Sequence, residues 1–238
     1  ARSENQLADD IRQSVLEAKG HLVELRRIFH AMPELGLVEH QTAARIAEEL
    51  SEIGLTVQTE VGVTGVVGVL ETGRPGQTLM IRADIDGLPV DELTGLPFAS
   101  SNGRMHACGH DGHITMVLGA ARILAEREDT LTGRIVFIFQ PAEEITSGAV
   151  AMLDDGLYDQ HPPDRVIGLH LWNQIPTGEV GVNRGTVFAS ADAIRVKVRG
   201  RGGHGALPHL SIDPVVAAAQ IVTAAQTVVS REVPPNDM

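Results

Sequence analysis

The chain of 238 residues is long enough to bury a substantial core, as one large domain or as parts of two. Hydrophobic residues make up 43% of it and charged residues 21%, which are the shares of a folded globular protein. The formal net charge of −12 argues against a nucleic-acid partner, because the phosphates would be repelled.

Three features of the sequence predict the compartment. The single cysteine allows no intrachain disulfide and fits a reducing environment. No apolar run approaches the roughly 20 residues that span a bilayer. Residues 1–6 lack the apolar core of a signal peptide. We therefore expect a soluble cytoplasmic protein with no membrane and no nucleic-acid partner.

The first part of the chain predicts two helices followed by three strands. Apolar residues recur at helical spacing over residues 7–29 and 41–53, with Pro33 after the first run and Gly54 after the second. Residues 55–60, 65–70 and 78–85 have the composition of strands. The third of these strands ends in Asp84 and Asp86, although an aspartate can also simply close a strand with an Asx-turn.

Strands and helices alternate in the rest of the chain. We expect a helix over residues 112–127, a central strand covered on both faces over 134–139, and a strand over 165–169. Residues 190–199 alternate like a half-buried strand, and a helix is expected from Asp213-Pro214 to about residue 229. The order predicts an α/β fold with a mostly parallel central sheet flanked by helices over residues 1–185, and the start of a smaller α+β domain over 186–238.

The stretch MHACGHDGH at residues 105–113 holds three histidines and the only cysteine. Imidazole nitrogen and thiolate sulfur are the usual protein ligands of zinc and its neighbours. Cys108 and His110 are separated by one glycine, so a tight loop could turn both toward one cation. The alternative is that His106 and His113 are ordinary histidines and that Cys108 is a small buried hydrophobe.

Potential ligands also follow the predicted strands. Glu143 and Glu144 come just after the strand at 134–139, and His170 follows the strand at 165–169. A pair of adjacent acids is often only a solvated turn. The accumulation of such groups at strand ends, together with the Cys-His loop before a helix, nevertheless favours a metal site at the carboxyl edge of one sheet.

Six blocks of sequence, in order along the chain, resemble the di-metal aminoacylase and carboxypeptidase superfamily. Its amidohydrolase branch includes hippurate hydrolases, N-acyl-amino-acid amidohydrolases and plant indole-acetyl-amino-acid hydrolases. The blocks are RRIFHAMPELG (26–36), IRADIDGLPV (81–90), MHACGHDGH (105–113), FIFQPAEE (137–144), GLHLW (168–172) and GGHGALPH (202–209). Six ordered blocks are a far more specific signal than one short motif.

The resemblance implies a catalytic domain that holds two divalent metal ions, and a smaller lid domain that forms a homodimer. Residues 1–185 match the first and residues 186–238 the beginning of the second. The metal ligands implied by the matching motifs are Cys108, His110, Glu144 and His170. Glu143 matches the general base, and His204 matches a lid histidine that reaches the substrate. Relatives carry one more metal-binding histidine near their C-terminus, with no counterpart among the residues present here.

Other matches and the choice of metal stay open at this level. Asp84, Asp86 and Asp111 fall in matching blocks without a defined role. A thiolate ligand favours zinc, whereas carboxylate and imidazole also suit manganese, cobalt or nickel.

The sequence thus predicts a metal-dependent amidohydrolase for small N-acyl amino acids, such as acetyl or benzoyl derivatives, with Glu143 as general base. One alternative is a non-catalytic fragment or pseudo-enzyme that only binds metal or dimerises. Another is a hydrolase in which Cys108 is the nucleophile and a histidine its base. That alternative leaves the two adjacent glutamates and His170 unexplained.

Overall fold

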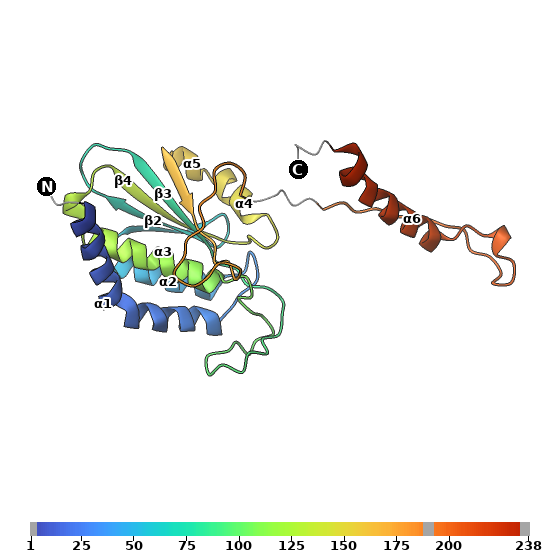
Figure 1. The fold of residues 1–238 in the computed structure, drawn as a ribbon, viewed down its shortest axis with the longest axis horizontal. Helices are drawn as coiled ribbons and strands as arrows, with labels where there is room; N and C mark the ends of the chain where they lie inside the picture. Colours follow the sequence, from blue (N-terminus) through green and yellow to red (C-terminus); the bar gives the residue numbers. More distant parts are fainter. Residues whose placement is uncertain (1–3, 188–192, 234–238) are drawn as a thin grey trace. The chain divides into compact units, whose positions relative to one another are not determined.

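The fold is known from a computed structural model, which describes residues 4–187 and 193–233. The chain forms two compact units, one up to Gly178 and one from Glu179 onward. The first unit is built on one β-sheet and its flanking helices (Figure 1). The predicted roles of two domains, catalytic and lid, stay predictions.

The sheet of the first unit has five strands in the order β1-β2-β4-β3-β5. Their bounds are Thr56–Val61 (β1), Gly65–Glu71 (β2), Thr78–Asp84 (β3), Arg134–Gln140 (β4) and Arg165–Gly168 (β5). Strands β4, β3 and β5 run parallel, whereas β2 is antiparallel to β1 and to β4. The residues that follow β3, β4 and β5 therefore leave the sheet at one edge.

Three helices cover one face of this sheet (Figure 1). They are α1 (Glu4–Ala31), α2 (His40–Glu52) and α3 (His110–Ala125). Their apolar sides meet Phe137 and Phe139 of β4 in one buried cluster. Val136 and Ile138, which point the other way, join a second cluster with α4 (Gly148–Asp154) and α5 (Leu157–Gln160). The prediction of a central strand buried on both faces is confirmed.

The helix ends follow from local sequence. Helix α1 stops two residues before Pro33, and α2 is followed by Gly54 with a φ of 83°. Helix α3 begins earlier than predicted, at His110, because Gly109 takes a φ of 92° and turns the chain into the helix. Helices α4 and α5 were not predicted, since they are too short to display a helical period.

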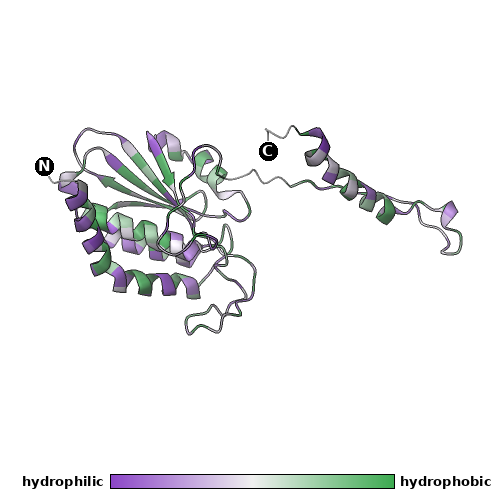
Figure 2. Ribbon diagram, viewed as in Figure 1, coloured by the Kyte–Doolittle hydropathy of each residue, from purple (hydrophilic) through white to green (hydrophobic). Residues whose placement is uncertain are grey.

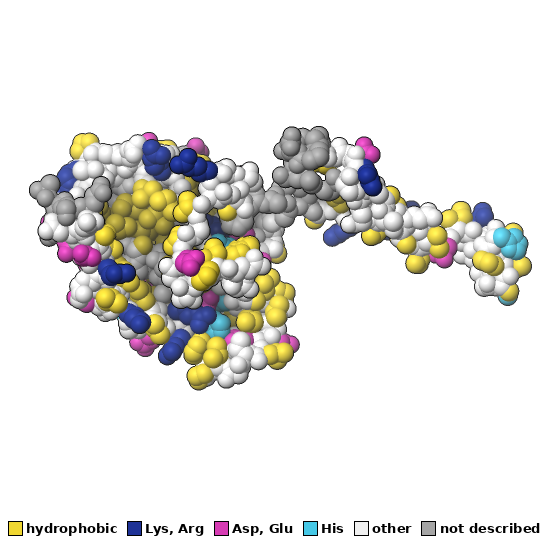
Figure 3. All heavy atoms as spheres, in the orientation of Figure 1, with side chains coloured by type: hydrophobic (Ala, Val, Ile, Leu, Met, Phe, Trp, Pro, Cys, Tyr) yellow, Lys and Arg dark blue, Asp and Glu magenta, His cyan; other side chains and the backbone are white. Residues whose placement is uncertain are grey.

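Hydropathy follows the layers of this unit. Figure 2 shows hydrophobic strands in the sheet and mixed hydrophobic and hydrophilic residues along α1. Strand β5 is one of the two edge strands, and its Val166 and Ile167 remain 51% and 50% exposed. In Figure 3 hydrophobic side chains gather in a hollow over the sheet.

No helix in the described ranges is both long and apolar enough to cross a membrane.

The second unit contains one longer helix, α6 (Pro214–Thr227), which the π-helical turn η3 (Val228–Glu232) continues. As predicted, α6 begins after Asp213, whose carboxylate accepts from the Val215 amide at 2.8 Å. The predicted strand over 190–199 is wrong for residues 193–199, and residues 190–192 lie outside the described ranges.

The failure of that strand has a physical reason. An alternating pattern assigns residues to two faces, but a strand also needs a neighbour for its backbone hydrogen bonds. Among the described residues of the second unit, the only β-pairing is one bridge between Arg201 and Ile212. Ile194, expected on the buried face, is 87% exposed.

Candidate metal centre

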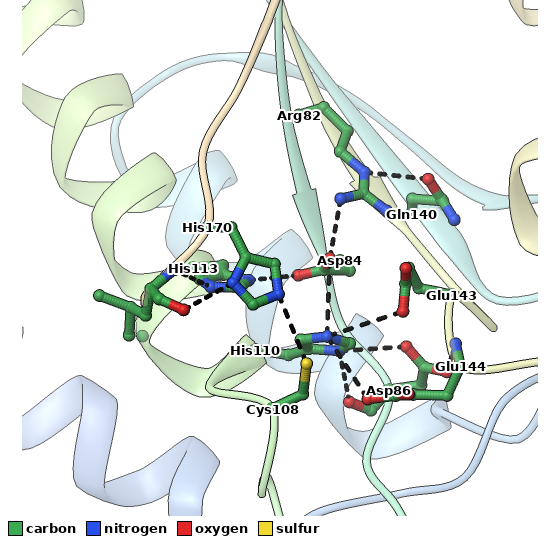
Figure 4. A network of polar contacts seen from close by, with 12 residues as sticks. Arg82, Asp84, Asp86, Cys108, His110, His113, Gln140, Glu143, Glu144 and His170 are labelled. Atoms are coloured by element: carbon green, nitrogen blue, oxygen red, sulfur yellow. Dashed lines mark hydrogen bonds and ion pairs between the residues drawn. The ribbon is translucent and has the colours of Figure 1, made fainter. Parts of the chain in front are cut away.

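The groups singled out in the sequence meet at the carboxyl edge of the sheet (Figure 4). Asp84 ends β3 and Asp86 follows it, Glu143 and Glu144 come just after β4, and His170 comes just after β5. Helix α3 brings its first residue, His110, to the same place, with Cys108 in the loop before it. Parallel strands and a helix start therefore gather residues that are up to 86 positions apart in the chain.

His110 is the centre of this arrangement and is 1% exposed. Its Nδ1 lies 2.8 Å from the Asp86 carbonyl oxygen, so the ring donates its proton there and leaves the Nε2 lone pair free. Nε2 makes no hydrogen bond and faces three carboxylate oxygens, those of Asp84 at 3.6 Å, Glu143 at 3.9 Å and Glu144 at 3.7 Å. Burial opposes protonation of His110, but Asp86, Asp84 and Glu144 raise its pKa.

Cys108 and His170 complete one side of the centre. The Cys108 Sγ lies 3.4 Å from the His170 Nε2. The His170 Nδ1 is 2.6 Å from the Leu171 carbonyl oxygen and donates to it, so Nε2 is the nitrogen that can act as a ligand. The ligand atoms of Cys108, His110 and His170 all lie within 4.8 Å of one another.

The environment of Cys108 bears on its chemistry. Burial, followed by the negative charge of Glu144, raises the pKa of the thiol to about 12. A cysteine nucleophile needs a lowered pKa to react as the thiolate at neutral pH. The surroundings therefore disfavour the cysteine-nucleophile alternative, whereas a cation between these groups would stabilise the thiolate.

Glu143 and Glu144 differ in exposure although both reach toward His110. The Glu143 side chain is 41% exposed and that of Glu144 20%. Burial and the neighbouring charge of Glu143 raise the pKa of Glu144, while His110 lowers it. The Glu144 main-chain amide donates to the Asp86 carboxylate at 3.0 Å, and this hydrogen bond ties the turn after β4 to the residues that follow β3. Glu144 is thus the more enclosed carboxylate, and Glu143 is the more open to solvent.

The donor set fits divalent cations. The His110 Nε2 and the Glu144 Oε1 are buried without a hydrogen-bond partner, which is costly unless another group satisfies them. One thiol, two imidazoles and carboxylates surround this point, and such a set suits zinc and its neighbours. Cys108, His110, Glu144 and His170, the ligands inferred from the sequence, all belong to groups that share His110.

His113 belongs to the centre, although the sequence analysis assigned it no role there. The His113 Nδ1 lies 2.6 Å from the Asp84 carboxylate, and its Nε2 accepts from the Leu171 amide at 2.8 Å. Both ring nitrogens are engaged in hydrogen bonds, so His113 joins β3 to the loop of His170. Its position three residues after His110, on the same face of α3, was the available signal.

The three aspartates to which the sequence assigned no role have different partners in the structure. Asp84 is 1% exposed. Burial opposes its ionisation, but the hydrogen bond from His113 and the charges of His110 and Arg82 hold its pKa well below the usual range. Asp86 orients His110. Asp111 pairs instead with Arg26 at 2.8 Å and His30 at 2.7 Å, which fastens the start of α3 to α1.

His204 lies in the second unit, in an exposed loop. Its Nδ1 accepts from the Ala206 amide at 3.1 Å, so in the neutral ring the proton is on Nε2. Its predicted contact with substrate stays a prediction.

Comparison with known proteins shows the family of this chain. A family model described as peptidase family M20/M25/M40 matches residues 80–237. The chain belongs to this family. The predicted resemblance to the metallopeptidase superfamily and its amidohydrolase branch is confirmed.

Among the relatives, N-acetyl-L-cysteine deacetylase of Bacillus subtilis is 43% identical over 96% of this chain and 54% of its own length. Hippurate hydrolase of Campylobacter jejuni is 42% identical over 94% of this chain and 58% of its own. A Bacillus subtilis crystal structure, described as a dinuclear metal binding peptidase from the M20 family, is 39% identical. It has a TM-score of 0.66 and matches 70% of this chain and 46% of that one. The chain spans about half the length of the curated relatives it matches.

Proposed function

We propose that this chain carries the metal centre of a metal-dependent amidohydrolase that cleaves N-acyl amino acids. The observation that carries the proposal is that Cys108 and His170 on one side, and Glu144 on the other, each group with the buried His110. Two relatives named for deacetylation of N-acetyl-L-cysteine and for hydrolysis of hippurate support the choice of substrate class. The M20 relative described as dinuclear supports two cations.

In this proposal Cys108, His110, Glu144 and His170 hold the cations. When bound, two divalent cations supply Lewis acidity for the scissile carbonyl and for the attacking water. His110 and His170 are held ready by their Nδ1 hydrogen bonds to main-chain carbonyl oxygens. A ligand whose ring is already oriented loses little freedom when a cation arrives.

Glu143 is the proposed general base. Its carboxylate lies beside the centre, 3.9 Å from the His110 Nε2, and its side chain is open to an approaching substrate. It accepts a proton from the attacking water and passes that proton to the leaving nitrogen, which contributes about 10²–10⁴-fold in rate. Glu144 is unsuited to this step because its oxygens are engaged as a ligand.

The proposal assigns His204 to the substrate. With its proton on Nε2, the ring donates a hydrogen bond to the oxyanion that develops on the scissile carbonyl, an interaction worth about 10²–10³-fold in rate. The sequence resemblance implies a lid domain that carries this histidine and forms a homodimer. We therefore propose that the assembled enzyme is a homodimer.

The test combines metal analysis with turnover of N-acetyl and N-benzoyl amino acids by the full-length protein. We expect bound divalent metal, hydrolysis that a chelator abolishes, and resistance to a thiol-alkylating agent while metal is bound. Glu143→Gln should keep its metal and lose hydrolysis by about 10²–10⁴-fold. Bound metal without turnover of any N-acyl amino acid would contradict the proposal and favour a non-catalytic metal binder.

A further inference from the structure

Glu39 is a buried carboxylate that serves two distant parts of the chain. It immediately precedes α2 and is fully buried, yet its side chain makes no capping hydrogen bond to that helix. Its Oε1 accepts from the Ala142 amide at 2.8 Å, and its Oε2 accepts from the Thr64 hydroxyl at 2.5 Å. The side chain therefore joins the start of α2 to the start of β2 and to the end of β4.

Ala142 is the residue on which the turn after β4 depends. It takes a φ of 49°, a left-handed conformation that is unfavourable for any residue with a β-carbon. Its carbonyl oxygen accepts from the amides of Ser147 and Gly148, each at 3.2 Å. A conformation of this kind persists only when its surroundings over-determine it.

Two buried carboxylates hold the backbone on either side of Glu143. Glu39 binds the amide of the preceding residue, Ala142, and Asp86 binds the amide of the following residue, Glu144, at 3.0 Å. The direction in which Glu143 and Glu144 leave the turn is set by these two peptide groups. A loss of either contact would let the turn relax from its left-handed conformation.

A carboxylate is a costly choice for this position. Burial raises the pKa of Glu39, and the hydrogen bonds from Thr64 and Ala142 offset only part of the effect. A well-packed apolar residue at such a site is often as stabilising as the buried charge. Packing alone therefore does not account for an acid here, whereas the need for an acceptor at the Ala142 amide does.

We propose that Glu39 is a positioning residue that sets the turn carrying Glu143 and Glu144. The inference rests on the proposed role of Glu143 as general base. Glu39 contacts neither the candidate metal ligands nor the general base itself through its side-chain hydrogen bonds, which go to Thr64 and Ala142. It acts through the main chain.

The chain offers a matched control in Glu34. Its carboxylate is also buried, and one oxygen accepts from the Thr42 amide at 2.8 Å and from the Thr42 hydroxyl at 2.9 Å. Glu34 thus makes the same kind of hydrogen bonds in the same segment of chain, but it holds the first turn of α2 and not the turn after β4.

The experiment compares Glu39→Met, Glu39→Gln and Glu34→Met in the metal-loaded full-length enzyme. The readouts are kcat and KM for N-acetyl amino acids, metal content, and hydrogen exchange of the peptide that spans residues 140–148. Exchange is measured with and without metal, so the contact with Ala142 is tested even if the enzyme hydrolyses none of these substrates. An enzyme that hydrolyses none of these substrates would contradict the proposed function but not the contact between Glu39 and Ala142.

We expect Glu39→Met to lower kcat by about 10²-fold, with KM within about threefold and faster exchange in residues 140–148. Glu39→Gln keeps an oxygen acceptor for the Ala142 amide and should recover most of kcat. Glu34→Met should leave both kcat and that exchange close to wild type. Equal losses in Glu39→Met and Glu34→Met, or unchanged exchange in Glu39→Met, would overturn the proposal.

If Glu39→Met does not fold, Thr64→Val replaces it. This variant removes the hydrogen bond that anchors the Glu39 Oε2 and leaves the carboxylate free to turn. It should raise exchange in residues 140–148 and lower kcat about tenfold, as expected for a smaller misplacement. Wild-type exchange and kcat in Thr64→Val would count against Glu39 as a positioning residue.

Discussion

Replacing His113 with Ala tests whether the metal centre is preorganised by the chain itself. His113 is fully buried and joins the Asp84 carboxylate, at 2.6 Å, to the Leu171 amide, at 2.8 Å. A hydrogen bond to a charged group contributes about 1.5–3 kcal/mol, and a neutral one about 1 kcal/mol. The variant should therefore lose about 2.5–4 kcal/mol of unfolding free energy, or roughly 60- to 1000-fold in the folding equilibrium.

The assay is urea unfolding of the protein in the presence of a chelator, so that cation binding adds nothing to the measured stability. His170→Ala is the control. Its ring is only partly buried, so we expect a small change in the stability of the metal-free protein but a large loss of metal affinity. A loss below about 1 kcal/mol in His113→Ala would refute the idea that this histidine links β3 to the β5 loop.

Three further predictions concern the ligand set, acid stability and the turn after β4. Cys108→Ala should lower metal content at limiting metal, and unchanged content by elemental analysis would remove Cys108 from the ligands. Burial lowers the pKa of His161, so below about pH 6.5 this ring is protonated in the unfolded chain before it is protonated in the folded protein. The free energy of unfolding should therefore decrease as the pH falls below that value. His161→Gln should reduce the decrease in the urea unfolding midpoint between pH 7.5 and 5.5, and an equally steep decrease would show that this ring contributes nothing. Gly148→Ala would place a β-carbon 1.6 Å from the Pro141 carbonyl oxygen and should lower the free energy of unfolding by about 1–3 kcal/mol, measured by thermal unfolding. Gly20→Ala is the control, because a β-carbon there has nothing within 4 Å and should not lower the stability.

Periodicity found the five strands and the three longer helices of the first unit because burial acts on each element separately. The run at 134–139 is apolar throughout because β4 is packed on both faces, and that condition is readable without knowing its neighbours. The same reasoning failed at residues 193–199. There the alternation is present, but no pairing strand accompanies it among the described residues.

The candidate ligands were within reach of sequence reasoning because each stands at the end of a strand or the start of a helix. Parallel β4, β3 and β5 bring such ends together as a matter of topology. Glu39 was not, since it matters through a hydrogen bond to a residue far away in the chain. Glu39 and Ala142 are 103 positions apart.

The order of residues alone determined the five strands and the three longer helices of the first unit, α6, and which side chains could bind a cation, because these depend on local spacing and chemical type. Only the tertiary structure decided which nitrogen of His110 and His170 points inward, which aspartate serves which histidine, and how the turn with Glu143 and Glu144 is held. Those choices depend on contacts between chain-distant groups, and no local pattern encodes the distance between them.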